Sequence, residues 1–199
     1  AIHFLNSTRP SDPRPHALRF SASFFNVIVS SMSVFMFWRI CSRMFQFPQS
    51  SIILTLLFAF GTLMWPYAGT LFSEPLTVLL ALISFSILLC HDRQLNEETG
   101  SLLSGPLFMA GLTLGLGTAA HITTLLFFPF FLLYSSYVGF AGTKNIKKII
   151  RPCILFTAGF LCMVLLIGVY NYIRFGSLLE TGRSMEMGKR LFFSYGFWT

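Results

Sequence analysis

Residues 65–75 read WPYAGTLFSEP and separate two strongly apolar runs, residues 52–64 and 76–89. Two prolines and a glycine interrupt the helical pattern there, which predicts a turn between two apolar helices. Trp65 and Tyr67 are residue types that gather at membrane–water interfaces. The stretch therefore predicts a turn at the surface of a membrane.

Glu74 is the only charged residue between Arg43 and His91. It precedes Pro75 at the predicted start of a helix. An acid there stabilises the helix dipole by roughly 0.3–1 kcal/mol, and proline suits the first helical turn. Taken alone, this position favours a capping role because acids near helix starts are common. The alternative is a carboxylate presented to a binding site at the membrane surface.

Composition indicates a polytopic membrane protein, since 54% of the 199 residues are hydrophobic and only 11% are charged. A soluble domain would carry about a quarter charged residues. The net charge of +7 favours anionic lipid or phosphate neighbours. Nucleic acid is not expected as a partner because no basic stripe with base-reading side chains occurs. The chain starts at Ala1 without a methionine, and we expect it to be a fragment.

The cysteines lie in or beside apolar segments without metal-ligand or redox spacing, and we interpret them as small apolar residues. They are Cys41, Cys90, Cys153 and Cys162.

The apolar runs predict an all-α fold, a polytopic transmembrane helix bundle with about six membrane segments. Residues 1–19 are expected to end an extracytoplasmic loop, residues 20–175 to form the bundle, and residues 176–199 to form a second extracytoplasmic loop that enters a further apolar element. The six predicted segments are residues 20–40, 50–64, 76–90, 106–120, 125–134 and 153–170, with Pro152 opening the last.

Loop charges predict the orientation of the bundle. Loops after the first, third and fifth segments carry half of the Lys and Arg residues, whereas residues 66–74 and 121–124 carry none. Basic loops are typically cytoplasmic, which would put Glu74 and His121 at the extracytoplasmic face. The basic loop residues are Arg39, Arg43, Arg93, Lys144, Lys147, Lys148 and Arg151. The two end segments carry the other seven cations on the outer side, where a layer that binds phosphate would also need them.

Small and polar residues at helical spacing indicate helix packing. In the first segment these are Ser23, Asn26, Ser30 and Ser33, and in the fourth they are Gly111, Gly115 and Ala119. His121 follows the fourth segment at a predicted hinge. A histidine there is commonly a hydrogen-bonded structural group, although polar residues at membrane depth are often functional.

Three motifs occur in a suggestive order: WPY at 65–67 followed by TLFSEPL at 70–76, GLTLGL at 111–116 leading to His121 and Pro129, and NYIRFGS at 171–177 followed by ETG at 180–182. Their order and spacing resemble the dolichyl-phosphate-mannose–protein mannosyltransferase-like branch of the GT-C glycosyltransferases. The bacterial members that transfer sugars onto lipids or cell-wall glycans look most similar, and the resemblance covers about residues 20–190.

The resemblance implies a multi-pass enzyme of the bacterial inner (plasma) membrane. It would move a hexose or pentose from a polyprenyl-phosphate carrier to a lipid, glycan or protein acceptor at the extracytoplasmic face. The family's catalytic Asp lies in the first outer loop, and Asp12 does not sit in the family's acidic motif. The catalytic residue is therefore expected upstream of this fragment. No cofactor is evident, and participation of a divalent metal is left open.

Six residues are candidates for substrate binding: Glu74, His121, Asn171, Arg174, Glu180 and Arg183. A departing lipid phosphate carries negative charge that cations stabilise, and Arg174 and Arg183 offer bidentate donors to phosphate. Arg174 could alternatively be an interfacial anchor. Asn171, three residues earlier, favours the site. His121 falls where relatives often carry Arg or Lys.

Two other function classes remain open. A secondary transporter or lipid flippase would also have hinged helices and scattered polar groups. However, no predicted segment carries an ionisable residue at its centre, no repeat is visible, and the polar groups gather at one face. A non-catalytic assembly subunit is the other alternative.

Overall fold

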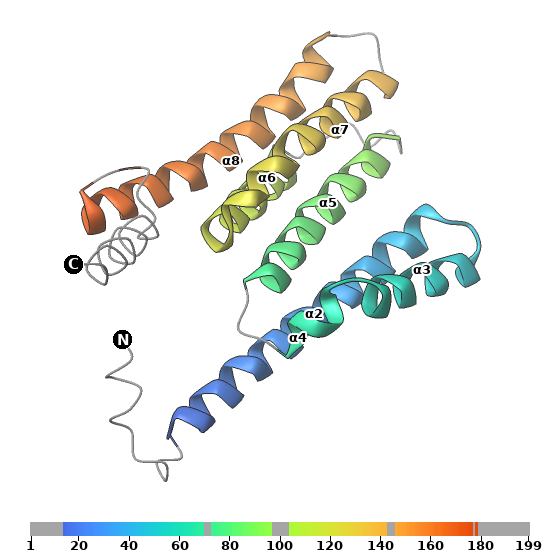
Figure 1. Cartoon of the computed structure of the whole chain (residues 1–199). Helices are drawn as coiled ribbons and strands as arrows, with labels where there is room; N and C mark the ends of the chain where they lie inside the picture. Colours follow the sequence, from blue (N-terminus) through green and yellow to red (C-terminus); the bar gives the residue numbers. More distant parts are fainter. Residues whose placement is uncertain (1–13, 70–72, 97–103, 143–145, 177, 179–199) are drawn as a thin grey trace, which may run out of the picture.

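Every element that the structure describes is helical, which confirms the predicted all-α class. The structure is a computed structural model, and it describes residues 14–69, 73–96, 104–142, 146–176 and 178. In chain order the elements are α2 (Arg14–Met44), α3 (Pro48–Gly61), α4 (Met64–Ala68), α5 (Glu74–Asn96), α6 (Ser104–Ala120), the 3-10 helix η1 (Ile122–Leu126), α7 (Phe127–Gly142) and α8 (Ile146–Phe175) (Figure 1).

Two helices are long and apolar enough to cross a membrane: Phe24–Met44 within α2 and Ile150–Phe175 within α8. Only 17% of the most apolar window of α8 is buried, so most of this helix presents apolar side chains outward. Shorter apolar helices occupy Pro48–Gly61, Glu74–Cys90 and Gly105–Ala120, and a fourth runs from Ile122 to Tyr137.

The helices α2, α3 and α5 form one side of the molecule. Phe37 of α2 stacks on Phe58 of α3, with ring centroids 4.3 Å apart. Near the middle of α2, the Ser33 hydroxyl lies 3.5 Å from the Pro75 carbonyl at the start of α5. At the end of α2, Arg43 Nη1 lies 2.6 Å from Cys90 Sγ late in α5. The earlier residue of α2 contacts the start of α5 and the later residue contacts its far part, so α2 and α5 run parallel.

The other side is built on the close approach of α6 and α8. A Cβ atom on Gly111 would collide with the backbone of Phe156, and one on Gly159 would collide with the backbone of Phe108. Helices approach this closely where small residues face each other. The buried core lies beside this contact and comprises Ala81, Leu88, Leu107, Ala110, Leu114, Phe156 and Phe160.

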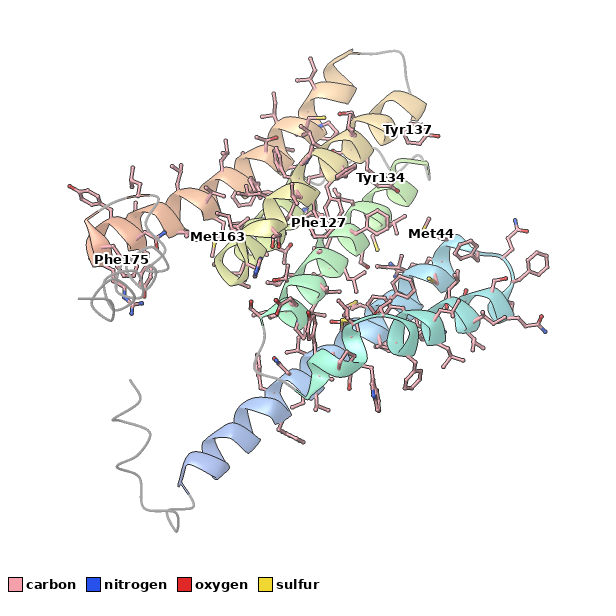
Figure 2. All side chains as sticks on the ribbon, in the orientation of Figure 1. Met44, Phe127, Tyr134, Tyr137, Met163 and Phe175 are labelled. Carbon is pink, nitrogen blue, oxygen red and sulfur yellow. The ribbon has the colours of Figure 1, made fainter. Side chains whose placement is uncertain are left out.

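The helix α7 packs antiparallel to α8 and parallel to α5. Phe128 lies against Phe160, with centroids 4.4 Å apart, and Ser136 Oγ lies 3.1 Å from Cys153 Sγ. Figure 2 shows this arrangement: α7 runs from Phe127 to Tyr137, and α8 returns past Met163 to Phe175. The predicted break near His121 is therefore present and reverses the chain between α6 and α7.

Several predicted boundaries were wrong, mostly because helices continue past the apolar runs. The helix α2 runs from Arg14 to Met44 rather than over residues 20–40, so Arg39 and Arg43, which were predicted to be loop residues, are helical. The helix α3 ends at Gly61 rather than near residue 64, and α5 continues to Asn96, so Arg93 is helical too. Pro152 lies inside α8, which starts at Ile146 and includes the basic residues 147, 148 and 151 that were predicted to be loop. Lys and Arg are good helix formers, and one proline removes a single backbone donor without ending the helix.

Candidate functional site

The start of α5 and the end of α6 lie at the same end of the molecule. The Ser84 hydroxyl donates to the Ala110 carbonyl over 2.8 Å, which places these residues side by side on α5 and α6. Ten residues lead from Ser84 back to Glu74, and ten lead from Ala110 on to Ala120. Each path is about 15 Å long at 1.5 Å per residue. Since the helices are antiparallel, Glu74 and His121, which follows Ala120, share one level.

The end of α8 lies at this same end. Gly159 packs against the backbone between Phe108 and Leu112, and α6 and α8 run parallel. By the same helical rise, Asn171 lies about 3 Å and Arg174 about 8 Å farther along the axis than Ala120. Figure 1 shows the start of α5, the α6–α7 turn and the end of α8 toward one side. We call this end of the bundle, which carries Glu74, His121, Asn171 and Arg174, the polar end.

Four of the six candidate binding residues thus lie at the polar end, although the chain separates them widely. They are Glu74, His121, Asn171 and Arg174. The other two, Glu180 and Arg183, lie outside the described residues.

Glu74 is the first residue of α5, followed by the fully buried Pro75. The Thr77 backbone amide donates to the Ser73 carbonyl over 3.1 Å, which begins the helical bonding one residue ahead of Glu74. The Glu74 side chain is half-buried, and its Oε2 atom is buried without a hydrogen-bond partner in the described part of the chain. The carboxylate is placed to stabilise the helix dipole, but this oxygen caps no amide.

His121 caps η1 through its side chain. Its backbone is extended, and Nδ1 accepts the Thr123 amide at 3.3 Å and lies 2.7 Å from the Thr123 hydroxyl. A ring nitrogen that accepts an N–H carries no proton, so in the neutral ring the proton is on Nε2. The imidazole is half-buried, and Nε2 can donate to a ligand while Nδ1 holds the turn. The structural and functional interpretations of His121 are therefore compatible.

The Thr124 side chain stabilises this turn. Its hydroxyl is fully buried and lies 2.9 Å from the Gly117 carbonyl and 2.7 Å from the His121 carbonyl. A Cβ atom on Gly117 would stand 2.7 Å from the Thr124 methyl group. The turn that presents His121 thus depends on the small size of Gly117 and on the buried hydroxyl of Thr124.

Arg174 is exposed on the last turn of α8. Its Nη1 donates to the Tyr170 hydroxyl over 2.8 Å, and its guanidinium carbon lies 5.1 Å from the Phe175 ring centroid. These contacts orient the side chain, and the fork retains donors beyond the one that Tyr170 takes. Asn171 is only 8% exposed, in contrast to the exposed Arg174.

Two residues of α2 lie close to this end and were interpreted from the sequence only as packing residues. Asn26 and Ser30 are 4% and 6% exposed, and Ser30 Oγ has no hydrogen-bond partner in the described chain. Their helical spacing with Ser33 was the available signal, but the sequence alone could not show which helix they face.

No three His, Cys, Asp or Glu side chains are grouped so as to hold a metal ion in the described ranges. Comparison of the chain with protein-family models, with curated proteins and with solved structures found no match.

Proposed function

We propose that this chain is part of an integral-membrane glycosyltransferase that moves a sugar from a polyprenyl-phosphate carrier to a lipid, glycan or protein acceptor. The observation that carries the proposal is that Glu74, His121 and the end of α8 lie toward the same end of the bundle. Sugar and phosphate need acceptors and donors together, and these side chains supply both.

The proposal includes a membrane with six crossings, by α2, α3, α5, α6, α7 and α8. The many exposed apolar side chains support it, among them Leu165 at 67% and Phe60 at 63% exposed. Lipid would cover them without a cost in apolar hydration. Trp65, 67% exposed beside Phe60 with ring centroids 5.3 Å apart, suits the interface at the polar end. In this proposal the membrane is the bacterial plasma membrane, and the polar end faces the extracytoplasmic side.

In the proposed reaction the carrier phosphate departs from the anomeric carbon with additional negative charge. Arg174 would hold the phosphate with its planar fork, since Tyr170 and Phe175 already fix the side chain at the helix end. His121 Nε2 would add a neutral donor at the same end of the bundle. The proposal assigns the base that activates the acceptor to an Asp upstream of this segment, and Glu180 and Arg183 to the same outer layer.

Replacing Arg174 tests this proposal. We expect Arg174→Ala in the full-length protein to lower kcat/KM for sugar transfer at least about tenfold, which corresponds to about 1.4 kcal/mol of transition-state stabilisation. Arg174→Lys should restore only part of the activity, because an ammonium lacks the bidentate fork. The measurement is transfer of radiolabelled sugar from a polyprenyl-phosphate donor.

Arg151→Ala is the matched control, because Arg151 is an exposed arginine near the opposite end of the same helix. It should retain the wild-type rate. Full activity in a well-expressed Arg174→Ala protein would return Arg174 to the role of an interfacial anchor and remove the main support for a phosphate site.

A transporter or lipid flippase is the second candidate, favoured by the break between α6 and α7 at η1. Broken helices are common at transport sites. Reconstituted vesicles separate the two functions, since a flippase would move the prenyl-phosphate lipid across the bilayer without forming a new glycosidic bond.

A further inference from the structure

The side of α2 that faces α5 carries buried polar residues. Ser33 is fully buried, and its hydroxyl lies 3.5 Å from the Pro75 carbonyl. Ser30 lies one turn earlier on the same face and is 6% exposed. Ser30 lies three residues before Ser33 on α2, and Glu74 lies one residue before Pro75 on α5. Because the two helices run parallel, both residues lie on the same side of the Ser33–Pro75 contact. Their axial levels differ by only about 3 Å.

The short helix α4 encloses this place from the side. It contacts both α2 and α5, and its first residue, Met64, is 6% exposed. In Figure 1, α4 lies on α2 close to the start of α5. Ser30 Oγ and Glu74 Oε2 are both buried atoms on the two helices that α4 contacts.

Most helical hydroxyls nearby are satisfied by their own helix. Ser31 and Ser33 donate to the carbonyls of Val27 and Val29, at 2.8 and 2.9 Å, and Thr77 donates to Ser73 at 3.1 Å. Such bonding to the preceding turn is the usual local solution for Ser and Thr in helices.

Ser30 departs from this pattern, because its buried Oγ has no partner in the described chain, and Glu74 Oε2 is in the same condition. Buried polar groups without partners are rare and costly. Two other buried hydroxyls, on Ser51 and Ser135, are also unpartnered. Both lie away from Glu74: Ser51 near the α2–α3 connection, and Ser135 beside the Tyr134 ring that contacts Phe85.

We propose that Ser30 and Glu74 together bind a hydroxyl group of a carbohydrate ligand. An ionised carboxylate oxygen can only accept, whereas a serine hydroxyl donates and accepts. A ligand hydroxyl satisfies both, since it donates to Glu74 and accepts from Ser30. A hard cation would need about six oxygen ligands, many more than these two side chains supply.

This site rests on the proposed function, because the sugar is that of the donor or that of a glycan acceptor, and both carry such hydroxyls. It deepens that function by assigning to α2, interpreted from sequence as a packing helix, a part in sugar recognition. It also gives the unusual carboxylate between two apolar runs a partner.

The test compares binding of intact and deoxygenated sugars to the full-length protein in detergent. The donor-type probe is a ten-carbon prenyl-phosphate hexose, and the acceptor-type probe is an octyl hexoside. Each is used intact and in its 2-, 3-, 4- and 6-deoxy forms, with dissociation constants from titration calorimetry. The variants are Ser30→Ala and Glu74→Gln. The control is Ser31→Ala, which alters an exposed hydroxyl bonded to its own helix.

For the wild type, we expect one deoxy form in one probe series to bind at least about tenfold more weakly than the intact sugar, since it loses a hydrogen bond to a charged group. In Ser30→Ala and Glu74→Gln this ratio should fall below about twofold, whereas Ser31→Ala should preserve it. The series that shows the effect identifies the source of the hydroxyl. Because each ratio is taken within one protein, a general loss of stability does not mimic the result.

Unchanged ratios in both variants would overturn this site and leave the proposed function standing, since the phosphate contact at Arg174 is separate. They would mean that the two oxygens hold only water. Failure of every sugar probe to bind the wild type would overturn both proposals.

Discussion

Single side chains at the polar end combine structural and chemical tasks. His121 caps the turn through Nδ1, which leaves Nε2 for a ligand. Tyr170 and Phe175 contact the Arg174 guanidinium and fix its orientation, so its remaining N–H donors are preoriented. Preorganised donors cost little reordering when a charged ligand arrives. Such positions are vulnerable to changes in the residues beneath them.

Thr124→Val should loosen the turn that presents His121. Valine keeps the shape of threonine but removes the hydroxyl that lies near the Gly117 and His121 carbonyls, so a buried bond is lost. We expect a loss of about 1–3 kcal/mol in the free energy of unfolding, measured by denaturant titration in detergent.

Thr118→Val provides the comparison, because its hydroxyl lies 2.6 Å from the Gly115 carbonyl of its own helix. It should cost less than Thr124→Val. Equal losses for the two variants would show that the buried hydroxyl of Thr124 has no special part in the turn.

At the scale of elements, the pair α6–α8 depends on glycines from both helices. Gly111 and Gly115 were predicted to face a neighbour, and both do so, against Phe156 and Met163 of α8. Ala119 was grouped with them but is exposed. Gly159 was not singled out because it is an isolated glycine in an apolar run, yet it meets the backbone of α6.

Gly159→Ala should force α6 and α8 apart. The new Cβ atom would collide with the Phe108 carbonyl, and a backbone atom cannot swing aside as a side chain can. We expect a loss of at least about 2 kcal/mol in the free energy of unfolding.

Gly168→Ala is the matched control within α8, where the added carbon would meet only the Leu178 side chain, at an ordinary contact distance of 3.7 Å. There alanine should stabilise the helix by about 0.5–1 kcal/mol. Opposite signs for the two substitutions are the diagnostic result. Stabilisation by Gly159→Ala would contradict the close packing of α6 and α8.

The sequence predicted helical segments and breaks better than helix ends. The prolines and glycine of residues 65–75 and the polar residues after Ala120 interrupt apolar runs, and both breaks are present. The ends at Arg14, Asn96 and Ile146 lie in polar sequence. There the helix continues through backbone hydrogen bonds. The apolar pattern that marks a membrane segment does not indicate where such a polar helix end lies.

The candidate site was predictable only in part. Alternation of direction along the chain was enough to bring Glu74, His121 and Arg174 to one end. The burial of Asn171 and the unpartnered hydroxyl of Ser30 depend on helix rotation and on which neighbour each face meets. A sequence without an alignment gives the spacing of a polar stripe but not its partner.

For the whole molecule, the arrangement of the helices predicts where each connection lies relative to a membrane. Gln46 is exposed between α2 and α3, whereas Gly69 is exposed after α4 at the polar end. In the proposed orientation, Gly69→Cys and Ile122→Cys should react with an impermeant maleimide on intact cells. Gln46→Cys should react only after permeabilisation, because its connection lies on the side of the basic residues.

The labelling requires a background without native thiols, since Cys41, Cys90, Cys153 and Cys162 are all free and Cys162 is exposed. That background, unlabelled under both conditions, is the control. Gly69 and Ile122 should behave alike because the antiparallel α5–α6 pair puts their connections at one level. Labelling of Gln46→Cys and Gly69→Cys from the same side would contradict a crossing by α3. The polar end would then not form one extracytoplasmic layer, and the support for a lipid-linked sugar site there would be lost.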